Sequence, residues 1–240
     1  MKDVIVIPLR HHALFSYLQS RLIDADISRM YCKEVHYELR GRHYFALAFG
    51  NISGGYEVRN AYYKGCLNNK DISLIRHLTE ETQETVCVFE GFMDFLSYMT
   101  LKLAGDRTVC LAIPCDYLVM NSVNNLKKTL ARLQEYSDIH CYLDNDLAGQ
   151  RTTETIAGMY GGRVSDESCH YAEYKDLNDY LRGKKRLIFN VLFCHLKLST
   201  TRAFFYAPIF SISHHRDCNI VRFNSSIFET YTNLINETDV

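Results

Sequence analysis

The 240-residue sequence lacks any uninterrupted apolar run of about 18 residues, the length that a membrane-spanning helix requires. Its first residues also lack the long apolar stretch of a signal peptide. A strong net charge is missing too, because 27 basic and 28 acidic residues leave a formal charge of -1. We therefore expect a cytoplasmic protein with no membrane partner. Histone-like binding of nucleic acid through a large positive charge is not expected either, although a local basic groove is compatible with this composition.

No two of the nine cysteines form a Cys-x-x-Cys pair, so the spacing that most zinc sites use is absent. The odd number of cysteines and the expected reducing compartment argue against a disulfide framework. Several cysteines stand inside apolar runs, where a thiol behaves as a small hydrophobic group. We predict reduced, largely buried cysteines and no zinc site in this chain.

Residues 1–80 are expected to form a small α+β unit with an antiparallel sheet. A short helix is predicted around Ala13–Leu18, and an acidic residue suited to capping precedes a second helix near Ile27. Alternating patterns separated by Gly41 and by Ser53-Gly54-Gly55 predict strands joined by tight turns. The predicted strands are Val35–Leu39, Tyr44–Phe49 and Tyr56–Arg59.

Basic and aromatic residues alternate directly after these strands. Arg59, Lys64 and Lys70 are interleaved with Tyr62 and Tyr63, a mixture that suits a phosphate backbone and stacked bases. A solvated loop with ordinary surface lysines explains the composition equally well. We treat the three cations as candidate nucleic-acid or nucleotide ligands.

Residues 84–185 alternate short apolar runs with helical patterns of 10–15 residues, which is typical of βαβ units in a parallel sheet. Sheets of this type place their sites at the carboxyl ends of the strands. The expected strands are Val86–Phe89, Tyr117–Met120 and Ile139–Leu143, with a fourth that begins near Arg163. The expected helices are Phe92–Leu103, Asn124–Tyr136 and Leu147–Met159.

Acidic residues stand where two of these strands end. Glu90 follows the first strand, Asp144 and Asp146 follow the third, and Asp94 lies one helical turn after Glu90. If the two strands are neighbours, their carboxylates converge, and several ionised carboxylates require a hard divalent cation. Mg²⁺ fits best because it keeps several waters and shares its coordination shell with substrate phosphates. Mn²⁺ is a possible substitute.

Two glycines accompany these acids. Gly91 and Gly149 would let the backbone approach a phosphate closely. Helix capping is the competing explanation for acids at strand-to-helix junctions, and for Asp146 alone it is the better one. For the whole set, metal binding is the better explanation.

The segments Phe89-Glu90-Gly91-Phe92-Met93-Asp94 and Leu143-Asp144-Asn145-Asp146-Leu147-Ala148-Gly149 resemble the two signature motifs of the Toprim domain. That domain is shared by DnaG-type primases, topoisomerases, small maturases of ribosomal RNA and OLD-type nucleases. The segment Tyr174–Leu181 further resembles the Lys-Asp-x-Asn-Asp/Glu stretch of Toprim primases. This resemblance implies that Asp176 helps to hold a second metal ion and that Lys175 is a nucleic-acid or nucleotide ligand. Asn178 stands where bacterial primases often have another acid.

The segment Tyr44–Asn60, with Lys64-Gly65 after it, resembles the N-terminal subdomain of the bacterial primase catalytic core. The resemblance covers about residues 10–185 and is closest to the Toprim primase-like proteins of mobile elements. It implies an α/β fold: a Toprim Rossmann-like parallel sheet flanked by helices, preceded by a small α+β primase-core subdomain. It also implies primer synthesis on single-stranded DNA from NTPs, with a helicase as a partner, for replication of a mobile element or plasmid.

The resemblance assigns catalysis to Glu90, Asp144 and Asp146, with Asp94 and Asp176 as further metal ligands. Two rivals remain: a Toprim-type metal-dependent nuclease and a catalytically inactive nucleic-acid-binding accessory protein. A phosphate loop of the type GxxxxGK[ST] is absent, which disfavours an OLD-type nuclease with an ATPase module. Residues 186–240 contain no glycine and match nothing in the family, so we expect a C-terminal extension there.

Overall fold

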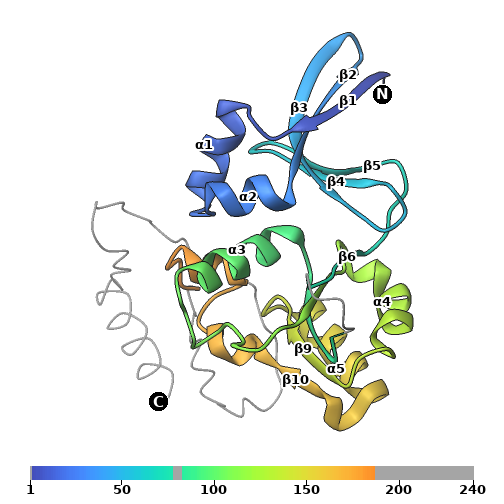
Figure 1. The fold of residues 1–240 in the computed structure, drawn as a ribbon, viewed down its shortest axis with the longest axis vertical. Coiled ribbons are helices and arrows are strands. Elements are labelled where there is room, and N and C mark those ends of the chain that lie inside the picture. Colours follow the sequence, from blue (N-terminus) through green and yellow to red (C-terminus); the bar gives the residue numbers. More distant parts are fainter. Residues whose placement is uncertain (1, 78–82, 187–240) are drawn as a thin grey trace, which may run out of the picture. The chain divides into compact units, whose positions relative to one another are not determined.

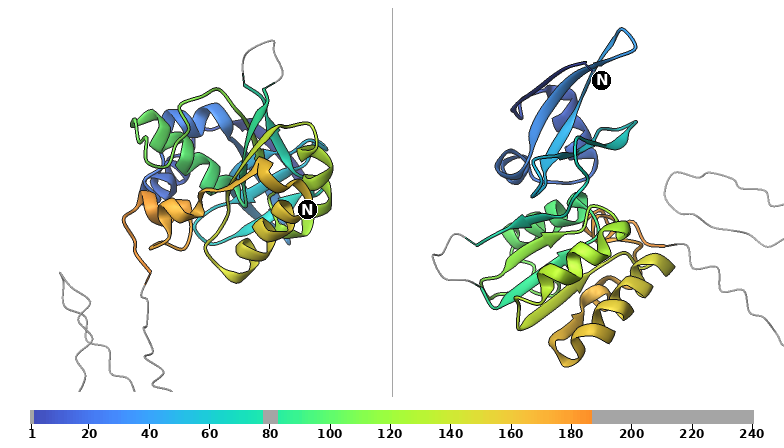
Figure 2. Two further views of the ribbon diagram at one scale, coloured as in Figure 1. Left: turned by 90° about the horizontal axis from the view of Figure 1, so that it is seen from below. Right: turned by 90° about the vertical axis from the view of Figure 1, so that its right-hand side faces the viewer.

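The computed structural model describes residues 2–77 and 83–186, which form two sheets with their helices (Figures 1 and 2). Apart from Arg186, the expected C-terminal extension lies outside the described residues. In the part of the chain that is described, no helix combines the length and apolarity needed to cross a membrane.

The first sheet is antiparallel, with the strand order β1-β2-β3-β4-β5. Its strands are β1 (Lys2–Pro8), β2 (Lys33–Leu39), β3 (Arg42–Gly50), β4 (Tyr56–Arg59) and β5 (Lys64–Leu67). The helices α1 (His12–Ser20) and α2 (Ala25–Tyr31) connect β1 to β2. The predicted cap of the second helix is present, because the Asp24 side chain accepts hydrogen bonds from the backbone N–H groups of Asp26 and Ile27.

The second sheet has the strand order β10-β9-β7-β8-β6. Its strands are β6 (Ser73–Ile75), β7 (Thr85–Phe89), β8 (Asp116–Val119), β9 (Asp138–Tyr142) and β10 (Val164–Asp166). Strands β7 to β10 are parallel, as predicted, whereas the short edge strand β6 pairs antiparallel with β8. The predicted α/β fold with a parallel sheet is therefore confirmed, with one antiparallel edge added.

Helices cover both faces of this sheet. Cys87 and Phe89 of β7 pack with α3 (Phe92–Leu103) and α6 (Leu177–Leu181), whereas the alternate residues Val86 and Val88 pack with α4 (Leu126–Leu133) and α5 (Leu147–Tyr160). Every residue of β7 is buried, which explains its continuous apolar sequence. Three short 3₁₀ helices complete the unit: η1 (Val123–Asn125), η2 (Gly161–Arg163) and η3 (Glu167–Tyr171).

The two sheets share one apolar core. The rings of Phe49 in β3 and Phe92 in α3 are stacked, with their centroids 5.2 Å apart. The backbone N–H of Asp24 donates to the Thr100 hydroxyl of α3 over 3.1 Å, and the Asn178 side chain donates to the Arg21 carbonyl over 3.0 Å. These contacts place β3 against the beginning of α3, and they join the helices α1 and α2 to α6 and α3.

Candidate metal centre

The acidic segments meet at the carboxyl edge of the second sheet. Strands β7 and β9 are parallel neighbours, and Phe89 pairs in register with Tyr142. Glu90 and Asp144 follow these strands by one and two residues. The condition on which the predicted convergence depended, that the two strands are neighbours, is therefore met.

Three aspartates form the tightest acidic cluster in the described residues. Asp94, Asp144 and Asp176 each offer one carboxylate oxygen, and these oxygens all lie within 4.8 Å of one another. Asp94 comes from the first turn of α3, Asp144 follows β9, and Asp176 caps α6 by accepting from the backbone N–H of Asp179 over 2.7 Å. Three separate chain segments thus supply the oxygen ligands that a hard divalent cation prefers.

The cluster strongly disfavours full ionisation. Burial raises the pKa of Asp94 well above its ordinary value, and the neighbouring Asp176, Asp144 and Glu90 raise it further. Burial and Asp176 also raise the pKa of Asp144, against the opposing charge of Lys175. A bound divalent cation would reverse both shifts, because it stabilises the ionised carboxylates.

Glu90 does not belong to the tight cluster, but the negative charges of neighbouring acids act on its carboxyl group. Burial, followed by the charges of Asp144 and Asp146, raises the pKa of Glu90 to about 7. Its Oε2 atom is buried and has no hydrogen-bond partner among the described residues. A buried carboxylate oxygen without a partner is costly, so this atom fits a cation ligand or a proton acceptor. The donor set as a whole fits a divalent metal ion.

The two carboxylate oxygens of Asp146 make different contacts. One oxygen caps α5, accepting from the backbone N–H groups of Ala148 and Gly149 over 3.0 and 3.1 Å. The other oxygen lies 4.0 Å from the Lys175 ammonium, which is also 3.4 Å from Asp144. Capping therefore uses one oxygen of Asp146 and leaves the second on the side of the acidic cluster.

Gly149 is required by packing within the motif itself. A Cβ atom at this position would lie 2.0 Å from the carbonyl oxygen of Asp144. The predicted reason for this glycine was close approach to a phosphate, and the structure supplies a different one, namely close approach of α5 to the loop that carries Asp144. At Gly91, in contrast, a Cβ atom would lie 3.4 Å from Asp94, which is ordinary contact.

Sequence reasoning missed the role of Asn145. Its side-chain amide donates to the carbonyl groups of Tyr171 and Tyr174 over 3.0 and 3.1 Å, and its backbone N–H donates to the Lys175 carbonyl over 2.7 Å. These bonds fix the segment that ends in Asp176 against the loop after β9. The position between two motif aspartates was the one signal available for Asn145.

Asn178 does not join the cluster. It is fully buried, and its amide nitrogen donates to the Ser97 hydroxyl over 2.8 Å as well as to Arg21. The residue that stands in place of a further acid therefore links α6 to α3 and to the end of α1.

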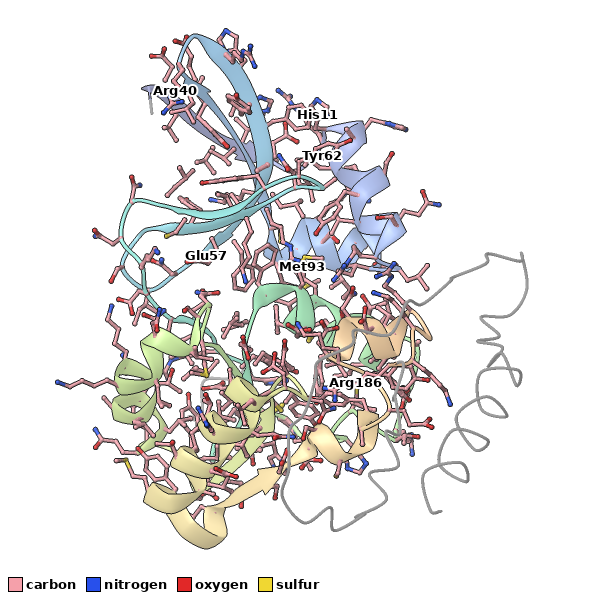
Figure 3. The ribbon with its side chains drawn as sticks, turned by 180° about the vertical axis from the view of Figure 1, so that it is seen from behind. His11, Arg40, Glu57, Tyr62, Met93 and Arg186 are labelled. Carbon is pink, nitrogen blue, oxygen red and sulfur yellow. The ribbon has the colours of Figure 1, made fainter. Side chains whose placement is uncertain are left out.

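A narrow pocket lies between the β4–β5 hairpin and the beginning of α3. Glu57 and Met93, both labelled in Figure 3, mark these two elements. The pocket is lined by Glu57, Val58, Arg59, Lys64, Gly91, Phe92 and Asn121.

Of the three cationic residues predicted to bind nucleic acid, Arg59 and Lys64 line this pocket and Lys70 lies on the surface. Arg59 and Lys64 are cross-strand partners in β4 and β5, so Lys64 belongs to a strand and not to a loop, which was the alternative explanation for these cations. Neither forms an ion pair with any residue that the structure describes. Lys70 is exposed in the segment after β5, and it does not line the pocket.

Comparisons with known proteins bear on both sheets. Residues 87–181 match a family model described as Toprim-like, and residues 3–68 match one described as a domain of unknown function (DUF8464). No curated protein matches the chain.

Two solved structures from bacteriophage T7 are similar to the chain. One is the primase fragment of the T7 primase-helicase protein, with 22% identity, a TM-score of 0.48, and coverage of 71% of this chain and 70% of that chain. The other contains the T7 lagging-strand DNA polymerase interacting with primase domains of two gp4 subunits bound to an RNA/DNA hybrid and dTTP. For this second structure the identity is 20%, the TM-score is 0.45, and coverage is 75% of this chain and 88% of that chain.

Proposed function

Because residues 87–181 form a Toprim-like domain, we propose that the protein is a primase-type nucleotidyltransferase that makes short RNA primers on single-stranded DNA. The observation that carries the proposal is the convergence of Asp94, Asp144 and Asp176 within 4.8 Å at the carboxyl edge of the sheet. We further propose that residues 1–80 and 84–185 act as two modules of this enzyme, in replication of a mobile element or plasmid, with a helicase as partner.

The acids divide the work of metal binding and catalysis. Asp94, Asp144 and Asp176 would hold a divalent cation, Mg²⁺ or Mn²⁺. Glu90 would lie beside it, together with the Asp146 oxygen that does not cap α5. When bound, such a cation polarises phosphoryl oxygens and lowers the pKa of an attacking hydroxyl. Asn145 positions Asp176, and Lys175 holds Asp144 and Asp146 in place. No protein nucleophile is needed.

The cationic residues supply the contacts for the nucleic acid and the nucleotide. Arg59 and Lys64 carry positive charges with no ion-pair partner among the described residues, beside Gly91 and the N-terminus of α3. A polyanion placed there gains attraction without breaking an existing pair. Lys70 extends the basic surface along the chain.

The direct test is a primer-synthesis assay with single-stranded DNA, labelled NTPs and Mg²⁺ or Mn²⁺. We expect labelled oligonucleotides from the wild-type chain and none from the Glu90→Gln variant. Complete absence of products from the wild type, under conditions where it binds metal, would contradict the proposal and favour a nucleic-acid-binding accessory role.

One observation favours a metal-dependent nuclease as the second candidate. The Oε2 atom of Glu90 is buried and has no hydrogen-bond partner among the described residues, so it is available to accept a proton from a water molecule. Metal-dependent shortening of an end-labelled strand, without primer synthesis, would establish this alternative.

Tyr62 is expected to stack on a base of the template. Its side chain is 99% exposed at the turn between β4 and β5 (Figure 3), and the turn is held by the Asn60 side chain, which accepts from the N–H groups of Tyr62 and Tyr63 over 2.9 Å each. Since base–aromatic stacking contributes about 1–3 kcal/mol, Tyr62→Ala should weaken binding of single-stranded DNA about tenfold. Fluorescence anisotropy with a labelled oligonucleotide measures the change.

The matched control is Tyr62→Phe, which keeps the ring and should bind as the wild type does. Equal affinity of the Tyr62→Ala variant and the wild type would exclude a stacking role for this residue.

A further inference from the structure

Lys175 brings a positive charge to the acids of the metal centre. Its ammonium nitrogen lies 3.4 Å from an Asp144 oxygen and 4.0 Å from the Asp146 oxygen that does not cap α5. Among the described residues, these two aspartates are its only ion-pair partners. Asp144 therefore takes part in two interactions, one in the cluster with Asp94 and Asp176 and one with this ammonium group.

Backbone contacts fix the position from which the Lys175 side chain starts. The backbone N–H of Asn145 donates to the Lys175 carbonyl over 2.7 Å, and the Asn145 side chain donates to the Tyr174 carbonyl over 3.1 Å. Asn145 stands between Asp144 and Asp146, so the segment that carries both acids also holds the backbone of the lysine. The half-exposed side chain thus begins at a point that is fixed relative to both carboxylates.

The acids of the centre offer one complete ligand set. In sites with two divalent ions, the ions lie about 3.5–4 Å apart. The resemblance to Toprim primases implied that Asp176 serves a second ion, whereas in the structure Asp176 shares one cluster with Asp94 and Asp144. No second group of three ligands forms among the residues that the structure describes. The carboxylate oxygens that a second ion would need, on Asp144 and Asp146, are the ones that contact Lys175.

We propose that the ammonium group of Lys175 takes the place of a second divalent cation, so that the protein without nucleotide binds a single divalent ion. That ion is held by Asp94, Asp144 and Asp176. The ammonium group neutralises charge on Asp144 and Asp146 and repels a further cation at short range. It also attracts phosphate oxygens as a compact positive charge. The inference rests on the proposed function, since it assigns the number of metal ions at the same centre.

The test counts the Mn²⁺ ions that the full chain binds without nucleotide, by isothermal titration calorimetry and electron paramagnetic resonance. The wild type should bind one ion per chain at saturation. Lys175→Met keeps an apolar side chain of similar length but removes the charge. This variant should bind two ions, because the freed oxygens of Asp144 and Asp146 are ligands that a hard divalent cation prefers. Neighbouring Mn²⁺ ions couple magnetically, so the resonance spectrum of the variant should also differ from that of the wild type.

Further variants separate the charge of Lys175 from its other contacts. Lys175→Arg keeps the positive charge and should bind one ion, as the wild type does. The double variant Lys175→Met with Asp146→Asn should return to one ion, because the second site loses a carboxylate that it requires. The matched control is Lys185→Met, which removes an exposed lysine that pairs with Glu173, and it should leave the count at one.

Failure of this inference is distinguishable from failure of the proposed function. Two ions in the wild type, one ion in Lys175→Met or two ions in Lys175→Arg would overturn the role of Lys175 even if primers are made. One ion in the wild type and two in Lys175→Met, in a protein that makes no primers, would uphold the role of Lys175 and refute primer synthesis. A wild-type chain that binds no Mn²⁺ would overturn both.

Discussion

Asp144→Asn should abolish tight divalent-cation binding and lower primer synthesis by about a thousandfold. Asp144 interacts with every other charged group discussed for this centre. It belongs to the cluster with Asp94 and Asp176. It also contacts Lys175, and its charge raises the pKa of Glu90. Loss of a metal that provides several kcal/mol of transition-state stabilisation corresponds to about three orders of magnitude in rate. Mn²⁺ titration followed by electron paramagnetic resonance measures binding, and labelled primer yield measures activity.

The same substitution should not unfold the protein. The pKa of Asp144 is raised in the folded state, so its ionised form destabilises the metal-free fold at neutral pH, and that destabilisation is relieved as the pH falls. Asparagine removes the charge, so the metal-free variant should melt at the wild-type temperature or above it.

Asp138→Asn is the matched control for the charge change. Asp138 is exposed at the opposite end of the same strand, β9, so its replacement should leave metal binding and synthesis unchanged. If Asp144→Asn retained both Mn²⁺ binding and primer synthesis, the acidic cluster would not be the catalytic centre.

Gly149→Ala should destabilise the fold by about 3 kcal/mol and disturb the metal centre at the same time. The added methyl group would meet the Asp144 carbonyl oxygen at 2.0 Å, a contact that neither α5 nor the loop after β9 relieves by turning a flexible side chain. For a protein of this size, such a loss lowers the melting temperature by about 6–12 °C. Calorimetric melting measures the destabilisation, and Mn²⁺ titration reports the displacement of Asp144.

Gly158→Ala, in the same helix, provides the comparison. Gly158 is exposed, and apart from the adjoining backbone of α5 no atom lies within 4 Å of the position of its Cβ. Because glycine weakens a helix interior, alanine should stabilise α5 by about 0.5–1 kcal/mol. The two substitutions should therefore change the free energy of unfolding in opposite directions. Destabilisation at both would show that α5 tolerates no added methyl group and that Gly149 has no special role.

The central part of the fold could be predicted from sequence because its signals are local. The apolar runs before Glu90 and Asp144 identify β7 and β9, both buried on two faces, and the acidic residue Asp24 identifies the start of α2. Strand β1 escaped prediction although it contains the apolar run Val4-Ile5-Val6-Ile7. Two other unpredicted strands give weak local signals. Strand β6 has three residues, too few for any periodicity, and β5 contains a glycine and a lysine.

The site was less predictable where its contacts are long-range. Asn121 depends on Asp71 and Ser73, about fifty positions earlier in the chain, and Asn145 depends on carbonyl groups about thirty positions later. An asparagine in a loop carries no mark of such partners. Glu90, Asp144 and Asp146 were easier to find because they follow the ends of strands, whereas Asp94 lies in the first turn of α3 and Asp176 was identified from the resemblance to Toprim primases. That Asp94, Asp144 and Asp176 form the tight cluster, with Glu90 beside it, could be seen only in the structure.

The positions of the charged groups along the chain have an evolutionary consequence. All five candidate metal-binding acids lie between residues 90 and 176, whereas both cations of the pocket lie between residues 59 and 64. A recombination event that joined a different upstream segment before residue 84 would replace the cationic residues proposed to bind the substrate. It would keep all five acids. Descendants of one such gene would then diverge in the nucleic acids they select while retaining a common reaction chemistry.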